Sequence, residues 1–302
     1  MESLQDAVAV ITGGAGGIGL ALARGAQARG ARVVIADVRA DALALAEQTL
    51  STGGETLAMC VDVSKPDEVR ALADATYARF GRVNLLFNNA GVFASGLAWE
   101  VSTEEYDWVM GVNQRSVING IRAFVPRMIE QGDPCHVTTI SSGAGITVNP
   151  GFASYSMTKH AVLALTEALY LDLASQGIRN IGVTIVMPGV VRSQVMFPEK
   201  TGPAPLQREL EARLRNPTLN ALEHFMRSAV DSGMPAEALA ERVYDAIRRQ
   251  NLYVLPNFDD EGSSAVAQAI GIGRATGSNP YPAILKNLLE QLSPEATAPQ
   301  GD

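Results

Sequence analysis

Residues 12–19 read Thr-Gly-Gly-Ala-Gly-Gly-Ile-Gly, and this stretch decides the fold. The apolar run that precedes it, residues 7–11 (AVAVI), predicts a strand. The spacing of Ile18, Leu22 and Ala26 after it predicts a helix. Glycines between a strand and a helix let the backbone approach a pyrophosphate, and the free N–H groups of the helix start attract its charge. The stretch therefore predicts a dinucleotide site.

A second apolar run, residues 32–36, ends at Asp37 and completes a strand–helix–strand unit. A carboxylate about 20 residues beyond the glycine turn suits hydrogen bonds to the hydroxyls of the adenosine ribose. Because this carboxylate would repel a 2′-phosphate, we expect NAD as the cofactor. NADP is the alternative, since the Arg39 guanidinium could pair with that phosphate.

Strand and helix signals alternate along the rest of the chain. Further strands are predicted at residues 56–61, 84–88, 136–141, 180–187 and 252–255. This alternation predicts an α/β fold of the Rossmann type, a doubly wound parallel sheet of about seven strands with helices on both faces. An apolar content of 47% is sufficient for a sheet that is buried on both sides.

We expect residues 1–256 to form a single dinucleotide-binding and catalytic domain. Within it, residues 193–233 have helical patterns and are predicted to form a small cap over the substrate, because ligands bind outside the carboxyl ends of the strands. Residues 257–293 are predicted to form a C-terminal helical extension. It would either cover the pocket or bury surface against another subunit. Residues 294–302 are expected to be a flexible tail.

Three side chains suggest the chemistry of the site. Tyr155 and Lys159 are one helical turn apart and share a helix face, and Ser142 lies upstream on a strand-like run. A phenol, an ammonium and a hydroxyl can act together on one carbonyl or carbinol oxygen. A nearby lysine cation would favour the phenolate and lower the tyrosine pKa from about 10. The alternative is a packed aromatic ring beside a surface amine.

Six motifs in the correct order, spanning residues 4–256, resemble those of the short-chain dehydrogenase/reductase family. The family's motifs are matched by residues 12–19 (its glycine-rich turn), 88–91 (NNAG), Asn113 (its catalytic asparagine), Ser142, Tyr155 with Lys159 (YxxxK), and Pro188-Gly189 (PG after a strand). Residue 193 is serine where the family often has threonine, which keeps the hydroxyl that contacts the nicotinamide carboxamide.

The resemblance implies the roles of individual residues. Asn113 would join Ser142, Tyr155 and Lys159 in catalysis by completing a proton path, whereas an asparagine in an apolar helix could also be a satisfied core amide. The implied cofactor contacts are Gly13, Gly16, Gly17, Ile18, Gly19, Asp37, Asp62, Val63, Asn89, Ala90, Gly91, Tyr155, Lys159, Pro188, Gly189, Val191 and Ser193.

We expect a bulky apolar or aromatic substrate. Ser142 and Tyr155 would contact its reacting oxygen, and Met196 and Phe197 would form an apolar mouth beside the nicotinamide, unless they only attach the cap to the body. Residues 106–129 and 251–256 are also similar to short-chain dehydrogenases with a C-terminal helical extension, including the Cα-dehydrogenases of lignin-derived aryl ethers.

Composition excludes several other classes of partner. A net charge of −8 without a basic cluster argues against nucleic acid and against an anionic membrane surface. The sequence has neither a signal-peptide pattern nor an apolar run of transmembrane length, and its two cysteines and three histidines lack metal-ligand spacing. We therefore expect a cytoplasmic protein without a metal.

The resemblance also implies a homodimer or homotetramer, because the family pairs its long fourth and fifth helices. We expect the apolar residues Val162, Leu165, Leu169 and Leu173 to contribute to that contact. The predicted function is reversible, NAD-dependent oxidation of a secondary alcohol to a ketone. The alternatives are an NADPH-dependent carbonyl reductase of the same fold and a dinucleotide-binding regulator without turnover.

Overall fold

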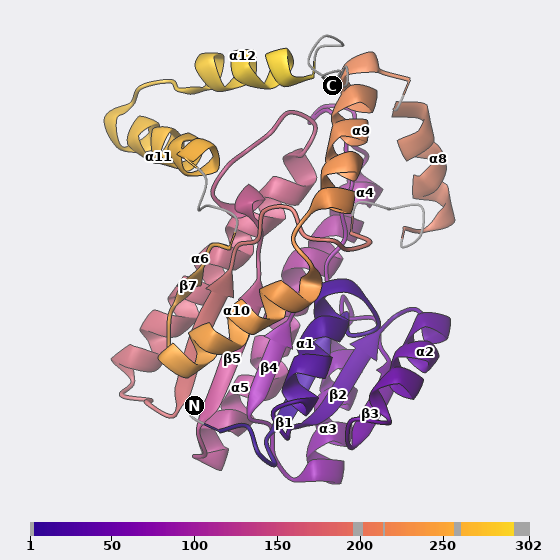
Figure 1. Ribbon diagram of the computed structural model, residues 1–302, viewed down its shortest axis with the longest axis vertical. Helices are drawn as coiled ribbons and strands as arrows, with labels where there is room; N and C mark the ends of the chain where they lie inside the picture. The colour runs from indigo at the N-terminus through magenta and orange to yellow at the C-terminus, as the bar shows by residue number, and fades with distance from the viewer. Residues whose placement is uncertain (1–2, 196–201, 214, 257–260, 293–302) are drawn as a thin grey trace, which may run out of the picture.

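The computed structural model describes residues 3–195, 202–213, 215–256 and 261–292 (Figure 1). Seven parallel strands form one sheet in the order β3-β2-β1-β4-β5-β6-β7. The strands are β1 (Val8–Thr12), β2 (Arg32–Asp37), β3 (Thr56–Cys60), β4 (Leu85–Asn88), β5 (Cys135–Ile140), β6 (Ile181–Val186) and β7 (Tyr253–Val254). Each strand lies within one residue of its predicted limits at both ends, so the predicted fold class is confirmed.

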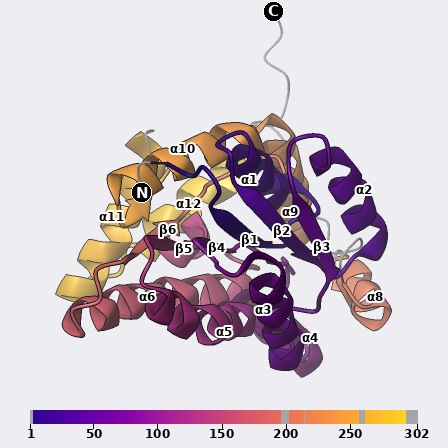
Figure 2. The same ribbon diagram turned by 90° about the horizontal axis from the view of Figure 1, so that it is seen from below.

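Helices cover both faces of the sheet (Figure 2). One face carries α1 (Gly17–Gln27), α2 (Ala40–Leu50) and α10 (Ala236–Arg249). The other carries α3 (Pro66–Phe80), α5 (Ser116–Gln131) and α6 (Ala153–Ser175), with α4 (Thr103–Met110) and the π-helical turn η1 (Gly111–Arg115) leading into α5. The sheet is therefore the middle layer of three.

Apolar cores on both faces of the sheet explain why β1 is apolar from Val8 to Ile11. Ala9 and Ile11 pack against α1 and α10, whereas Val8 and Val10 pack on the opposite face against α3 and α5. All five residues of β1 are buried. A parallel strand between two helical layers has no solvent-facing side, so its sequence lacks the polar alternation of a half-exposed strand.

The order of the strands places a ligand site at the end of β1. The chain proceeds outward from β1 through β2 to β3, and then returns to continue through β4 on the other side. The crossover helices on either side of such a switch point diverge and leave a crevice at the carboxyl ends of the strands. The turn at residues 13–16 leaves β1 into this crevice.

Four more helices lie at one end of the molecule (Figure 1). α8 (Ala204–Arg213) and α9 (Pro217–Ser232) lie between β6 and α10, and α11 (Glu261–Thr276) and α12 (Tyr281–Gln291) follow β7. Helices are thus present in both the predicted cap and the predicted extension. Among the described residues, no helix could span a membrane and no cluster of His, Cys, Asp and Glu could hold a metal ion.

Three of the four apolar residues that we assigned to a subunit contact on α6 are directed inward. Val162, Leu169 and Leu173 are buried, and the two leucines belong to the core between α6 and the sheet. Our expectation that these three residues contribute to a subunit contact was therefore wrong, whereas Leu165, the fourth, is partly exposed. The apolar side chains that α6 does expose include Met157, which is 44% exposed, and Leu171, which is 63% exposed.

Candidate active site

A cavity of about 1010 Å³ lies at this switch point, beside the turn that follows β1. Ligand pockets usually measure about 300–1,000 Å³, so this one has room for more than a small alcohol. All the predicted cofactor contacts line it, and so does Ser142. Asn113 does not line it. Met196 and Phe197 lie outside the described residues.

The glycine turn forms one wall of the cavity. Gly13 has a φ of +64°, and a Cβ atom there would lie 2.9 Å from the Cα atom of Ala90, so only glycine fits. Gly16 begins α1 without a side-chain cap, and Gly17, Ile18 and Gly19 line the cavity. The first N–H groups of a helix lack intrahelical partners. This wall can therefore bind the pyrophosphate of a dinucleotide.

Asp37 lies at the end of β2 beside this wall and is 7% exposed. Its Oδ2 atom accepts a hydrogen bond from the Ala15 N–H (3.3 Å), and its Oδ1 atom accepts bonds from the Arg39 N–H (3.1 Å) and Nε (3.3 Å). The carboxylate is therefore fixed, and its environment suits the hydroxyls of an adenosine ribose.

The Arg39 side chain extends from Asp37 across the turn. Its Nη1 atom donates to Gln194 Oε1 (3.3 Å), and its Nη2 atom lies 3.7 Å from the position that a Cβ atom on Gly16 would occupy. The guanidinium thus connects the loop after β6 to the ribose side of the cavity.

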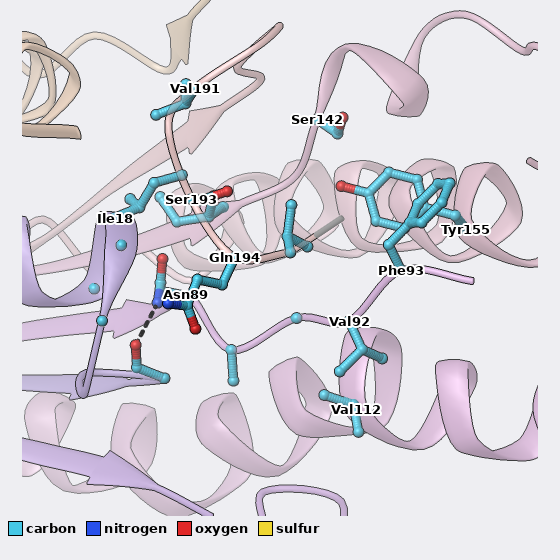
Figure 3. A pocket seen from close by; sticks show the side chains of 18 of the residues that line it. Ile18, Asn89, Val92, Phe93, Val112, Ser142, Tyr155, Val191, Ser193 and Gln194 are labelled. Atoms are coloured by element: carbon cyan, nitrogen blue, oxygen red, sulfur yellow. Dashed lines mark hydrogen bonds between the residues drawn. The ribbon is translucent and has the colours of Figure 1, made fainter. Parts of the chain in front are cut away.

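Tyr155 and Ser142 both line the cavity, and the phenolic hydroxyl of Tyr155 is directed toward Ser142 (Figure 3). Ser142 follows β5, and its Oγ atom accepts a bond from the Ala144 N–H (3.1 Å), which leaves its proton available for another acceptor. Burial raises the pKa of Tyr155 above its usual value of 10.0, and the hydrogen bond with Ser142 acts in the opposite direction. The phenol is therefore protonated at neutral pH and can act as an acid toward a substrate oxygen.

Lys159 lies one turn beyond Tyr155 on α6 and is 4% exposed. Its Nζ atom donates to the Ile140 carbonyl (3.0 Å) and lies 5.5 Å from the centroid of the Tyr155 ring. Burial lowers the pKa of Lys159 to about 8. Our expectation that Lys159 lowers the tyrosine pKa is not met here, because burial of Tyr155 dominates and the serine, not the ammonium, opposes it.

Asn113 lies in the π-helical turn η1 and is 1% exposed. Its Oδ1 atom accepts from the Val92 N–H (2.7 Å), while its Nδ2 atom donates to the Val92 carbonyl (2.9 Å) and to Thr158 Oγ1 (3.1 Å). The side chain is thus a satisfied amide that fixes the backbone after β4. Its participation in a proton path remains a prediction.

Sequence reasoning missed an aromatic wall beside the tyrosine. The Phe93 ring makes edge-to-face contacts with Tyr155 (centroids 5.2 Å apart) and with Phe152 (4.8 Å). Phe93 follows the carboxyl end of β4 closely, and that position on a strand directed at the cavity was the available signal. Nothing local marked Phe152 as a neighbour of Phe93.

The cap and the extension supply the rest of the apolar lining. Met226 and Val230 of α9 and Val266 of α11 line the cavity. Phe93, Phe152 and Val230 form one apolar cluster, against which Met226 and Leu292 pack. Of the two alternatives for the extension, the contribution of Val266 favours covering the pocket.

Residues 7–202 match the family model for short chain dehydrogenases, and the chain belongs to the short-chain dehydrogenase/reductase family. Members of this family are oxidoreductases that bind a nicotinamide dinucleotide. This is the family that the sequence motifs predicted, among them the glycine turn, Asp37, Ser142, Tyr155 and Lys159.

Two relatives and one solved structure illustrate the similarity. The chain is 36% identical to a 1-deoxy-11-beta-hydroxypentalenate dehydrogenase of Streptomyces avermitilis over 85% of this chain and 86% of that one. It is 34% identical to a C alpha-dehydrogenase of Sphingobium sp. strain SYK-6 over 85% and 82%, which confirms the predicted similarity to that group. A short-chain dehydrogenase/reductase of Burkholderia phymatum, solved in complex with NAD, superimposes with a TM-score of 0.85 at 34% identity, covering 93% and 98%.

Proposed function

We propose that this protein interconverts a secondary alcohol and a ketone with NAD as the hydride carrier. The observation that carries the proposal is that Ser142, Tyr155 and Lys159 line the same cavity as the glycine turn and Asp37. One part of this cavity suits a dinucleotide, and the other presents acid–base groups to a small molecule. The relatives that are named as dehydrogenases support this reading.

The nicotinamide, when bound, supplies the hydride acceptor for the alcohol or the hydride donor for the ketone. Tyr155 exchanges a proton with the reacting oxygen, and the Ser142 hydroxyl holds that oxygen in place. Gly13, Gly16 to Gly19 and Asp37 hold the dinucleotide. Lys159 places an ammonium in the same cavity, 5.5 Å from the centroid of the Tyr155 ring, where it stabilises negative charge that develops on the reacting oxygen.

The lining favours an apolar or aromatic substrate. Phe93, Phe152 and Tyr155 present aromatic surface, and Val190, Val195 and Met226 add aliphatic surface. Aromatic rings prefer edge-to-face and offset contacts with other rings. The proposed substrate is therefore a secondary alcohol with a bulky apolar or aryl group beside the carbinol carbon.

The function is tested by following NADH absorbance at 340 nm while the purified full chain is incubated with NAD and a panel of aryl, alicyclic and short aliphatic secondary alcohols. We expect turnover to be highest with the aryl and alicyclic alcohols. No turnover with any alcohol or with the corresponding ketones, together with measurable NADH binding, would favour the dinucleotide-binding regulator instead.

Met226 is expected to limit substrate size. Because it extends from α9 into the apolar cluster beside Tyr155, Met226→Ala should enlarge the pocket by several methylene-sized groups. One methylene in an apolar pocket changes discrimination by about 10–200-fold, so the kcat/KM ranking should shift toward bulkier alcohols. Ile129→Ala, at a residue of α5 that is 37% exposed, is the control. An unchanged ranking in Met226→Ala would place the size limit elsewhere.

NAD is expected to be preferred over NADP by at least about tenfold in kcat/KM, because the buried Asp37 carboxylate repels a 2′-phosphate. Arg39 already pairs with Asp37 and Gln194, so it is not free to neutralise that phosphate without losing those contacts. The measurement compares both cofactors for the wild type and for Arg39→Ala. Equal kcat/KM values in the wild type, with NADP use lost in Arg39→Ala, would show that the guanidinium dominates.

A homodimer or homotetramer is expected, through the exposed stripe of α6. Met157, Ala161, Ala164, Ala168 and Leu171 recur at helical spacing, and none of them is buried. Small side chains let two helices approach closely, so Ala164→Glu should place a charge in the contact and release monomers. Light scattering at micromolar concentration measures this. A monomeric wild type would contradict the prediction of a homodimer or homotetramer.

A cytoplasmic location also stays a prediction.

A further inference from the structure

The cap is attached to the body through Arg213, the last residue of α8. Its guanidinium makes two parallel bonds with Glu105 of α4, Nη1 to Oε1 (3.0 Å) and Nη2 to Oε2 (2.5 Å). Glu105 is completely buried, and the Arg213 side chain is 9% exposed. A buried carboxylate requires a paired cation, so α8 has one defined position on α4.

The same guanidinium holds the backbone that follows β4. Its Nη1 atom also donates to the Ser95 carbonyl (3.1 Å). A Cβ atom on Gly96 would lie 2.6 Å from Nη1, so the arginine lies directly against the chain. The second cap helix, α9, contacts the same residue, because the Ser95 hydroxyl donates to Glu223 Oε2 (3.0 Å). Both cap helices thus hold Ser95.

Ser95 belongs to a short segment, residues 92–96. The other end of this segment contacts Asn113 and Tyr155. Asn113 bonds to both the N–H and the carbonyl of Val92. The ring of Phe93 packs edge-to-face against Tyr155 (Figure 3). Only Ala94 therefore separates Phe93, whose ring contacts the proposed catalytic tyrosine, from Ser95, which both cap helices hold.

We propose that Arg213 and Ser95 are positioning residues that transmit the docking of the cap through residues 92–96 to the ring of Tyr155. The proposal rests on the proposed function and deepens it. With the cap docked, Ser95 is fixed from both sides, and Phe93 holds the phenol at the angle at which it meets the substrate oxygen. With the cap displaced, Ser95 loses bonds to α8 and α9, and the support of Phe93 weakens.

An ion pair that only holds the cap in place would change the kinetic constants differently from one that also orients Tyr155. A lid that only encloses substrate changes KM when it is loosened, because it contributes binding that is equal in the ground state and the transition state. A segment that orients Tyr155 changes the rate of the chemical step as well. Comparing the change in KM with the change in kcat therefore distinguishes a lid from a segment that orients Tyr155.

The experiment compares the wild type with Arg213→Gln, Arg213→Lys, Ser95→Ala and the double variant Glu105→Gln/Arg213→Gln. The double variant leaves no buried charge unpaired, so it tests the coupling even where the single change prevents folding. Arg248→Gln, which removes an arginine from an exposed ion pair with Asp245, is the matched control. The measured quantities are KM, the single-turnover rate at saturating alcohol, the Kd of NADH by fluorescence, and hydrogen–deuterium exchange of peptides covering residues 92–96.

We expect Arg213→Gln and the double variant to slow the single-turnover rate by about tenfold or more, since small misplacements of a catalytic group can cost up to about 10²-fold. Exchange in residues 92–96 should accelerate, Ser95→Ala and Arg213→Lys should give intermediate effects, and the Kd of NADH should remain within about twofold of the wild type. Arg248→Gln should match the wild type in every measurement.

A rise in KM with an unchanged single-turnover rate and unchanged exchange in residues 92–96 would overturn the coupling and leave the cap as a lid. Failure of the proposed function is distinguishable, because a wild type that oxidises no alcohol would still report the coupling by hydrogen exchange. In that case, faster exchange in Arg213→Gln than in Arg248→Gln would support the mechanical link, and equal exchange would refute it.

Discussion

Replacing Tyr155 with phenylalanine is expected to lower turnover by about 10²–10⁴-fold, the usual contribution of a general acid–base group. The change removes only the phenolic oxygen. The ring keeps its edge-to-face contact with Phe93, and Lys159 keeps its bond to the Ile140 carbonyl. The proton at the substrate oxygen then has no positioned donor or acceptor. NADH binding, measured by fluorescence, should stay within about twofold of the wild type, because no hydrogen bond of the glycine turn or Asp37 is altered.

Tyr170→Phe provides the matched control, since it makes the same chemical change on the same helix at a residue that is 46% exposed. It should leave both turnover and cofactor binding unchanged. If Tyr155→Phe retained more than about a tenth of the wild-type rate, general acid–base catalysis by Tyr155 would be excluded. Loss of NADH binding together with turnover would instead point to a disrupted site.

The features that sequence analysis predicted correctly are those that local physics determines. The glycine turn follows a strand that is apolar from Val8 to Ile11, and such a run is typical of a strand between two helical layers. Asp37 comes at the end of the next strand, so its place in the cavity follows from the parallel order of β1 and β2. Tyr155 and Lys159 share a face because helical geometry requires it.

The features that were missed depend on contacts between distant segments. Arg213 and Glu105 are 108 residues apart in the sequence, and nothing near either one marks it as half of a buried pair. The orientation of α6 was misjudged for a related reason. Apolar and small residues occur around much of this helix, so its sequence did not distinguish the face that meets the sheet from the exposed face with Met157 and Leu171.

The electrostatics of the catalytic pair could not be predicted from spacing. Residues four apart on a helix are neighbours, and an ammonium beside a phenol favours the phenolate when both are solvated alike. In the folded chain both groups are buried. Burial disfavours the charged form of each, which raises the pKa of Tyr155 and lowers that of Lys159. Burial is a property of the whole fold, and the sequence pattern does not contain it.

Replacing Lys159 with methionine is expected to lower turnover by about 10²-fold or more, since it removes the cation that Lys159 contributes to the cavity beside Tyr155 and the predicted cofactor contacts. It should do so without lowering stability at pH 7. Burying the ammonium destabilises the fold by up to about 3 kcal/mol, because its pKa is 10.5 when solvated and about 8 in the folded protein. Methionine removes that penalty, and the loss of a partner for the Ile140 carbonyl, about 1–3 kcal/mol, offsets part of the gain.

The pH dependence of unfolding tests this account separately from activity. Below pH 8 both the folded and the unfolded wild type carry the proton on Lys159, so the full penalty is present. Between pH 8 and 10.5 the unfolded chain binds more protons than the folded one, so the wild type gains stability as the pH rises. Lys159→Met lacks this gain, so its stability relative to the wild type should be greatest at pH 7 and decline toward pH 10.

Urea unfolding of both proteins at pH 7, 8.5 and 10 measures the difference, and Lys286→Met, an exposed lysine of α12, is the matched control, for which no pH-dependent difference is expected. A Lys159→Met protein that is less stable than the wild type by more than about 3 kcal/mol at pH 7 would mean that the ammonium is a net structural support. Active-site groups are commonly retained at the expense of stability. A stable but inactive Lys159→Met protein would show that Lys159 is such an active-site group. Its charge would then be required for activity, whereas the packing of the fold would not require it.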